Sequence, residues 1–133
     1  MTQEDKELLF KDLCARLPYN IKCCIYNFYR DEWEDEVVTI NNFPELIDTF
    51  TISEIKPYLF PLSSMTEEQK QHISDRWGIN EDFDFEIDPN WGEYFVDLCD
   101  AVDYINWLNE NHFDYRGLIE KSLALDATGL NIY

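Results

Sequence analysis

Residues 21–28 read Ile-Lys-Cys-Cys-Ile-Tyr-Asn-Phe, and this stretch decides the class of fold. Isoleucine, tyrosine and phenylalanine favour extended backbone, and the apolar side chains fall roughly at alternate positions. The stretch therefore predicts a β-strand with one face turned toward a core. Apolar residues make up 45% of the chain and aromatic residues 16%, which is enough to build that core.

The segment before this strand has the pattern of a helix. Leucine recurs every four residues from Leu9 to Leu17 and forms one apolar stripe. Thr2 is a favoured N-cap residue with an acidic residue three positions later, which is close to a capping box, and Pro18 ends the pattern. We therefore predict a helix over Thr2–Leu17.

Two more strands are predicted after residue 28. Val37–Ile40 has strand content, and the asparagines and proline of residues 41–44 indicate a turn. Phe50–Ile52 and Ile55 indicate a third strand, followed by an extended segment between two prolines. Because the links are short, the three strands are expected to form an antiparallel meander on the first helix.

Two helices are predicted in the second half of the chain. A capping box at Thr66–Gln69 begins a helix that ends near Trp77, with Gly78 as its stop. The longest predicted helix runs from Glu93 to about Asn111. Its apolar face is expected to hold Phe95, Leu98, Cys99, Val102, Ile105 and Leu108.

These elements predict an α+β fold. We expect a small antiparallel sheet of about four strands, packed with an N-terminal helix and a long C-terminal helix. The apolar tail from Leu118 is expected to dock on the same core. A length of 133 residues fits a single domain over residues 1–133.

Charge is distributed unevenly along the chain. There are 28 Asp and Glu residues against 10 Lys and Arg, a formal charge of −18, and the acidity begins at Asp31. Lys and Arg drive binding to nucleic acid and to anionic membranes, so we expect direct contact with neither. The expected partner is a basic protein surface, for example that of a nucleic-acid-handling host protein. The alternative is that the acidity serves solubility alone.

Two acidic segments are candidate interaction surfaces. The first is expected to be a charged connection that includes a tryptophan, and its residues are Asp31, Glu32, Trp33, Glu34, Asp35 and Glu36. The second is predicted as an alternating strand over residues 82–88 that turns Asp82, Asp84, Glu86 and Asp88 toward water. Such carboxylates lie about 7 Å apart, close to twice the rise of about 3.4 Å per nucleotide along a nucleic-acid strand.

The second acidic segment also has an interpretation as a calcium loop. From Asp82 to Glu93, oxygen-bearing side chains fall at the ligand positions of an EF-hand. Ile87 stands where the sharp turn of that loop requires glycine, and Pro89 follows two positions later. We therefore expect a strand without a bound ion. The four cysteines lack zinc-site spacing, so neither a metal nor a cofactor is predicted.

The same sequence features indicate where the protein works. The first residues, Met-Thr-Gln-Glu-Asp-Lys, contain no apolar segment of the kind found in signal peptides. No apolar run reaches membrane-spanning length. We therefore expect a cytoplasmic protein with free thiols.

Three stretches, Asp12–Tyr19, Ile55–Glu68 and Trp107–Ala127, together make up 43 of the 133 residues. They resemble a family of small acidic proteins from gut Bacteroidales genomes, their mobile elements and their phages. The resemblance implies a bacterial or phage cytoplasmic setting and carries no assigned activity. The sequence departs from the family pattern at Asn20, Phe60 and Ser122, which stand in place of Gly, Arg and Gly.

The third stretch contains a further candidate site, made of His112, Asp114, Tyr115 and Arg116. A histidine two residues from an aspartate suggests a catalytic or metal-binding cluster. The alternative is that a helix ends here and Asp114 caps a short turn.

The function that we favour from the sequence is a non-enzymatic, acidic protein-interaction domain. Its specific form is an inhibitor from a phage or mobile element that occupies the basic nucleic-acid-binding surface of a host defence protein. One alternative is a small metal-binding protein or enzyme that uses Asp82–Glu93 or His112–Arg116. Another is a housekeeping accessory domain.

Overall fold

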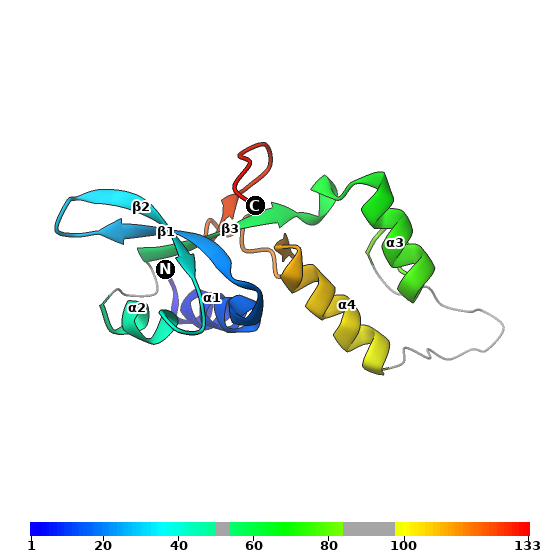
Figure 1. Cartoon of the computed structure of the whole chain (residues 1–133), viewed down its shortest axis with the longest axis horizontal. Coiled ribbons are helices and arrows are strands. Elements are labelled where there is room, and N and C mark those ends of the chain that lie inside the picture. Colours follow the sequence, from blue (N-terminus) through cyan, green and yellow to red (C-terminus); the bar gives the residue numbers. More distant parts are fainter. Residues whose placement is uncertain (50–53, 84–97) are drawn as a thin grey trace.

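The computed structural model describes residues 1–49, 54–83 and 98–133. Three helices and three strands make up most of its first half: α1 (Gln3–Arg16), β1 (Ile21–Asn27), β2 (Glu32–Val38), α2 (Phe43–Thr49), β3 (Ile55–Pro61) and α3 (Glu67–Trp77). They are followed by α4 (Leu98–Glu110), β4 (Phe113–Asp114) and β5 (Leu125–Asp126). The helices α1 and α2 lie beside the β1–β2 hairpin, α3 and α4 form a second group, and β3 runs between them (Figure 1).

The five strands form one mixed sheet, so the α+β class is confirmed and the all-antiparallel arrangement is wrong. The strand order is β2-β1-β3-β4, and β5 also pairs with β3. β1 is antiparallel to β2 and β3, whereas β4 and β5 run parallel to β3. These last two strands are only two residues long. They come from a segment distant in sequence, and no local pattern predicts such pairing.

Two predicted helices are confirmed with their caps. The hydroxyl of Thr2 accepts a hydrogen bond from the Asp5 amide at 3.1 Å and begins α1. The hydroxyl of Thr66 accepts one from the Gln69 amide at 3.2 Å and begins α3. α3 ends at Gly78, whose φ of 66° is left-handed and therefore suits glycine.

Of two predictions between residues 31 and 44, one is wrong and one is confirmed in part. Most of the acidic run, Glu32–Glu36, is part of strand β2, and it is extended because each of these residues faces a partner on β1; Asp31 lies in the turn before it. Asn41 and Asn42 form a turn as predicted, and α2 begins directly after them at Phe43. Pro44 is tolerated there because the first helical turn needs no amide donor.

Two strand predictions fall partly or wholly outside the described residues. The third strand was expected from Phe50–Ile52, which lie outside, and β3 begins at Ile55 and includes the segment between the two prolines. The strand expected over residues 82–88 does not begin as predicted, because Asp82 and Phe83 form a turn. Residues 84–88 lie outside the described part of the chain.

The helix before residue 111 differs from its prediction. Its described part is α4, 13 residues long, whereas α1 has 14, and residues 93–97 lie outside. Leu108 is buried as predicted, but Val102 and Ile105 were expected in the core and are exposed, and Tyr104 is buried in their place. Aromatic side chains on another face of the helix pack toward α3 and displace the expected apolar face: Trp77 lies 5.6 Å from Tyr104 and 6.2 Å from Trp107 between ring centroids.

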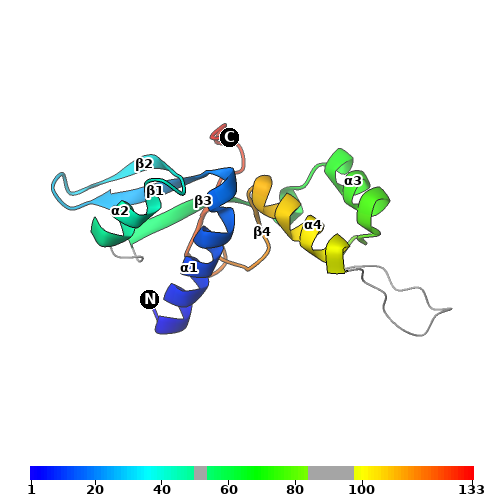
Figure 2. The ribbon, with the colours of Figure 1, turned by 60° about the horizontal axis from the view of Figure 1, so that its bottom comes forward.

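The buried apolar side chains form two clusters. The first joins α1, the sheet and α2 to the tail through Leu118, Leu123 and Ala124, which confirms that the tail docks on the core. The second joins α3 and α4 through residues such as Ile73 and Leu108. Figure 2 shows these two helices side by side, and α4 also contacts α1. That both clusters belong to a single domain over residues 1–133 stays a prediction.

Candidate functional site

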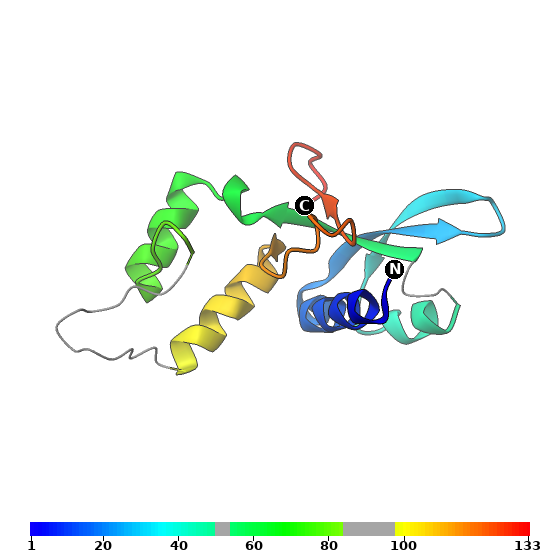
Figure 3. The ribbon, with the colours of Figure 1, turned by 180° about the vertical axis from the view of Figure 1, so that it is seen from behind.

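The first acidic segment lies on the edge strand of the sheet. In the order β2-β1-β3-β4, β2 is the outermost strand. Four carboxylates on or next to it, those of Asp31, Glu32, Asp35 and Glu36, are exposed, and we call them the acidic edge. The hairpin that carries them projects from the end of the molecule opposite to α3 and α4 (Figure 3).

Exposed aromatic side chains surround the acidic edge. Tyr29 is 98% exposed, Phe28 60% and Trp33 48%. Tyr26 packs between two of these residues: its ring centroid lies 5.2 Å from that of Phe28 and 5.4 Å from that of Trp33. Its hydroxyl also donates to the Asp31 carboxylate. The hairpin therefore combines negative charge with apolar contact area.

Some carboxylates of the first segment have partners within the chain. Arg30 pairs with Glu34 at 3.1 Å, and the Tyr58 hydroxyl donates to Asp35 at 2.7 Å. Burial and that hydrogen bond raise the pKa of Tyr58, so it remains a donor at neutral pH. Within the described ranges, Glu32 and Glu36 take part in no ion pair.

The second acidic segment is described only at its beginning. Asp82 is exposed in a turn beyond α3, where its amide donates to the Asn80 side chain at 2.9 Å. Asp84, Glu86 and Asp88 lie outside the described residues. The structure therefore does not bring Asp82 to the hairpin: α3, which Asp82 follows, lies at the opposite end of the molecule from the β1–β2 hairpin (Figure 1).

The segment His112–Arg116 meets α1 in a buried ion-pair network. The Asp12 carboxylate accepts from Arg16 at 2.9 and 3.0 Å and from Arg116 at 2.8 Å. Arg16 also donates to the Phe113 carbonyl at 2.7 Å. Sequence reasoning did not select Asp12 and Arg16, although both belong to the first stretch of the family resemblance. Their four-residue spacing is a usable signal.

The other side chains of this segment have structural partners. The Asp114 carboxylate accepts from the amides of Leu118 and Ile119 at 3.0 and 2.9 Å, so it caps a turn. The Tyr115 hydroxyl donates to Asn109 at 2.9 Å. His112 stacks on Tyr133 at 3.6 Å between ring centroids. The arrangement favours the structural interpretation of the segment over the catalytic one.

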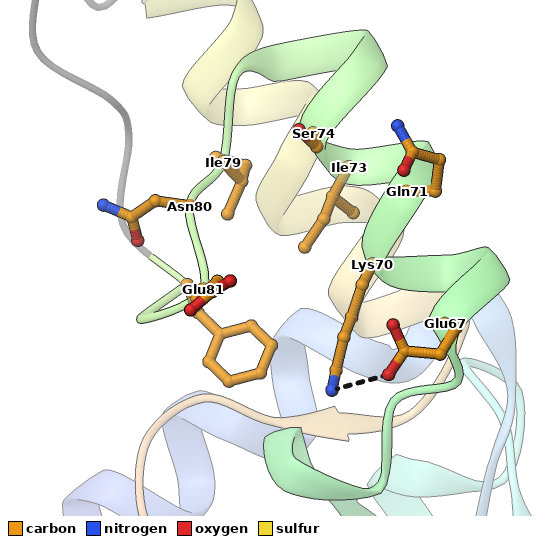
Figure 4. Close-up of a pocket in the computed structure, with 9 residues that line it drawn as sticks. Glu67, Lys70, Gln71, Ile73, Ser74, Ile79, Asn80 and Glu81 are labelled. Carbon is orange, nitrogen blue, oxygen red and sulfur yellow. Dashed lines mark hydrogen bonds and ion pairs between the residues drawn. The ribbon is translucent and has the colours of Figure 1, made fainter.

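Two cavities lie near α3. The larger, about 600 Å³, lies between α3 and residues 79–83, with Ile73 and Ile79 as apolar lining. Lys70 is paired with Glu67 at 3.4 Å in its wall (Figure 4). A second cavity of about 440 Å³ is lined by Phe60, Ser64, Thr66, Gln69, Glu110, Asn111, His112, Phe113 and Tyr133.

The described cysteines are poor nucleophiles. Cys14, Cys23 and Cys24 are free, and burial raises the pKa of each thiol. Cys14 is the most exposed of the three. Over residues 1–49, 54–83 and 98–133, no three His, Cys, Asp or Glu side chains gather as metal ligands. In the same ranges no helix has the length and apolar character of a membrane span.

The chain matches no family model, no curated protein and no solved structure.

Proposed function

We propose that this protein is a non-enzymatic interaction domain whose acidic edge binds a basic surface of a partner protein. One observation carries the proposal: the carboxylates of Asp31, Glu32, Asp35 and Glu36 are exposed along an edge strand beside exposed aromatic residues. Carboxylates attract a basic surface and speed its approach, and aromatic side chains supply the buried contacts that hold it.

In its specific form, the protein is an inhibitor from a phage or mobile element that covers the nucleic-acid-binding surface of a host defence protein. The net charge of −18 supports this form, because such surfaces are basic and are filled by phosphates in their normal complexes. The resemblance to Bacteroidales phage and mobile-element proteins supports the setting.

The proposal is tested with a neutral-edge variant, Glu32→Gln, Asp35→Asn and Glu36→Gln. These substitutions keep shape and remove three charges. The matched control removes three exposed charges elsewhere, through Glu81→Gln, Glu110→Gln and Glu120→Gln. Parent, variant and control are immobilised and exposed to a Bacteroidales lysate at low and high salt.

We expect the parent and the control to retain the same basic protein at low salt, and the neutral-edge variant to lose it. High salt should release the retained protein from the parent and from the control, because screening weakens the attraction between charges. The proposal is wrong if all three proteins retain the same set. Added duplex DNA or RNA should displace the retained protein, and failure to do so contradicts the inhibitor form alone.

A further inference from the structure

We infer that the partner binds as an extended basic segment that adds a strand to the outer side of β2. Its backbone hydrogen bonds go to Trp33 and Asp35, and its basic side chains face the carboxylates of the acidic edge. This inference rests on the proposed function and names the kind of partner.

The backbone of β2 is oriented for such an addition. In an antiparallel strand, the amide and carbonyl of one residue point to the same side, and successive residues alternate. The Asn42 side chain donates to the Val37 carbonyl at 2.8 Å. That contact indicates that Val37 points its backbone away from β1.

The opposite side of the sheet gives the same orientation independently. Lys22 faces Val37 in the β1–β2 register. Its amide donates to the Tyr133 hydroxyl at 2.9 Å, and that hydroxyl donates to the Tyr58 carbonyl of β3 at 2.9 Å. Lys22 therefore directs its backbone toward β3, so Val37 receives no ladder bond from it. Asp35 and Trp33 stand two and four residues before Val37. Their backbone amides and carbonyls therefore also point away from β1.

No residue in the described part of the chain uses the outward groups of Trp33 and Asp35. Among residues 1–49, 54–83 and 98–133, β2 pairs with β1 alone, and no described residue bonds to these two amides or carbonyls. Asn42 closes the edge at Val37. An open edge of this kind is a template for an added strand, and its open length runs from Trp33 to Asp35.

The side chains of β2 specify the sequence of the added strand. Glu32, Glu34 and Glu36 lie on one face, opposite Asn27, Ile25 and Cys23 of β1. Residues directly opposite in an added strand would have Cβ atoms about 5 Å away. Since Glu34 is paired with Arg30, lysine or arginine is favoured mainly opposite Glu32 and Glu36.

The other face of β2 favours apolar residues. Trp33, Asp35 and Val37 lie there; the Asp35 carboxylate accepts from the Tyr58 hydroxyl, and Trp33 and Val37 are 48% and 49% exposed. The added segment should therefore alternate basic and apolar side chains. Carboxylates on an edge also repel a second acidic strand, so β2 of another copy of this chain is disfavoured as the occupant.

The probe is a short fluorescent peptide of alternating lysine and valine, used with the full chain. Asp35→Pro removes the outward amide and leaves the β1 ladder, because that amide points away from β1. Asp35→Asn is the matched control, which loses the charge and keeps the amide. We expect the dissociation constant to rise about tenfold for Asp35→Pro and less than about threefold for Asp35→Asn.

A second peptide keeps the inference testable if Asp35→Pro does not fold. It carries N-methyl groups on alternate amides, which remove its backbone donors and keep its charge. Parent protein should bind it about tenfold more weakly. Only the unmethylated peptide should slow hydrogen exchange at the amides of Trp33 and Asp35.

The outcomes separate this inference from the proposed function. Equal affinity for both peptides, unchanged exchange at Trp33 and Asp35, or no binding of the lysine–valine peptide overturns strand addition. In each of these three cases the proposed function still stands if the parent retains a basic protein from lysate and the neutral-edge variant does not. If the neutral-edge variant retains that protein unchanged, the proposed function fails as well.

Discussion

Asp12 and Arg16 form a two-point ion pair inside the protein, with no exposed side-chain surface on either residue. The Asp12 carboxylate also accepts a hydrogen bond from Arg116, and the Arg16 guanidinium also donates one to the Phe113 carbonyl. One turn of α1 therefore fixes the segment that follows α4. The three stretches of the family resemblance meet here, because β3 also pairs with Phe113 and Asp114.

Arg16→Met should reduce the free energy of unfolding by about 3–5 kcal/mol, because it leaves a buried carboxylate short of its main partner. Urea denaturation followed by circular dichroism measures the loss. The control is Arg30→Met, which breaks the exposed pair with Glu34 and should cost less than about 1 kcal/mol. Equal losses for the two variants would contradict the structural role of Asp12 and Arg16.

His112 should make stability fall on acidification. Burial, together with the nearby Arg16 charge, lowers its pKa from 6.5 to about 4. Between these pH values the unfolded chain binds a proton that the folded chain does not, so stability decreases as the pH falls through this window. The measurement is urea denaturation at several pH values.

His112→Asn is the reference for that experiment, because asparagine tolerates the φ of 62° at this position. At each pH, the free energy of unfolding of the variant is subtracted from that of the parent. The difference no longer contains the contribution of the many carboxylates, which titrate in both proteins. The parent should lose stability relative to the variant between about pH 6.5 and pH 4. A difference that does not change with pH would show that His112 titrates normally.

Tyr133→Phe should expose the amide of Lys22 to hydrogen exchange. The Tyr133 hydroxyl bridges that amide and the Tyr58 carbonyl, and so extends the β1–β3 ladder beyond the pair Cys23↔Pro57. We expect faster exchange at Lys22 and a loss of about 1 kcal/mol in the free energy of unfolding. Tyr29→Phe, at a fully solvated tyrosine, should change neither quantity.

Thr66→Ala should destabilise the protein by about 1 kcal/mol, since it removes the side-chain acceptor for the Gln69 amide. Thr2→Ala tests the corresponding contact with Asp5. Thermal unfolding measures both. A melting temperature unchanged by Thr66→Ala would mean that water replaces the cap without loss.

The parts of the fold that the sequence predicts are those that local chemistry determines. Thr66, Gln69 and Gly78 specify the two ends of α3 through contacts within one turn. The acidic part of β2, Glu32–Glu36, was not predicted as a strand because acidic residues have low strand propensity, and pairing with β1 overrides that preference. The hairpin makes the acidic segment an edge strand, which sequence reasoning described only as a charged connection.

The candidate sites were predicted to different degrees. The exposed carboxylates and Trp33 could be chosen from composition alone, because a run of charges lies at the surface. The direction in which the β2 amides and carbonyls point depends on the strand register. That direction is read from the contacts of Lys22, Val37 and Tyr133 together. The burial of Asp12 and Arg16 depends on residues far away in sequence. The four-residue spacing alone therefore does not distinguish a buried ion pair from an ordinary surface pair.

The contacts of α1 with the segment after α4 also set the order of folding during synthesis. Arg16 and Phe113 are 97 positions apart, and Asp12 and Arg116 are 104 apart. A ribosome therefore releases α1 long before it makes the residues that cover Arg16. Until then Asp12 and Arg16 have only each other as partners, and the leucine stripe of the helix is uncovered. Completion of this core is expected to wait for the closure of a very long loop, which makes folding slow and largely post-translational.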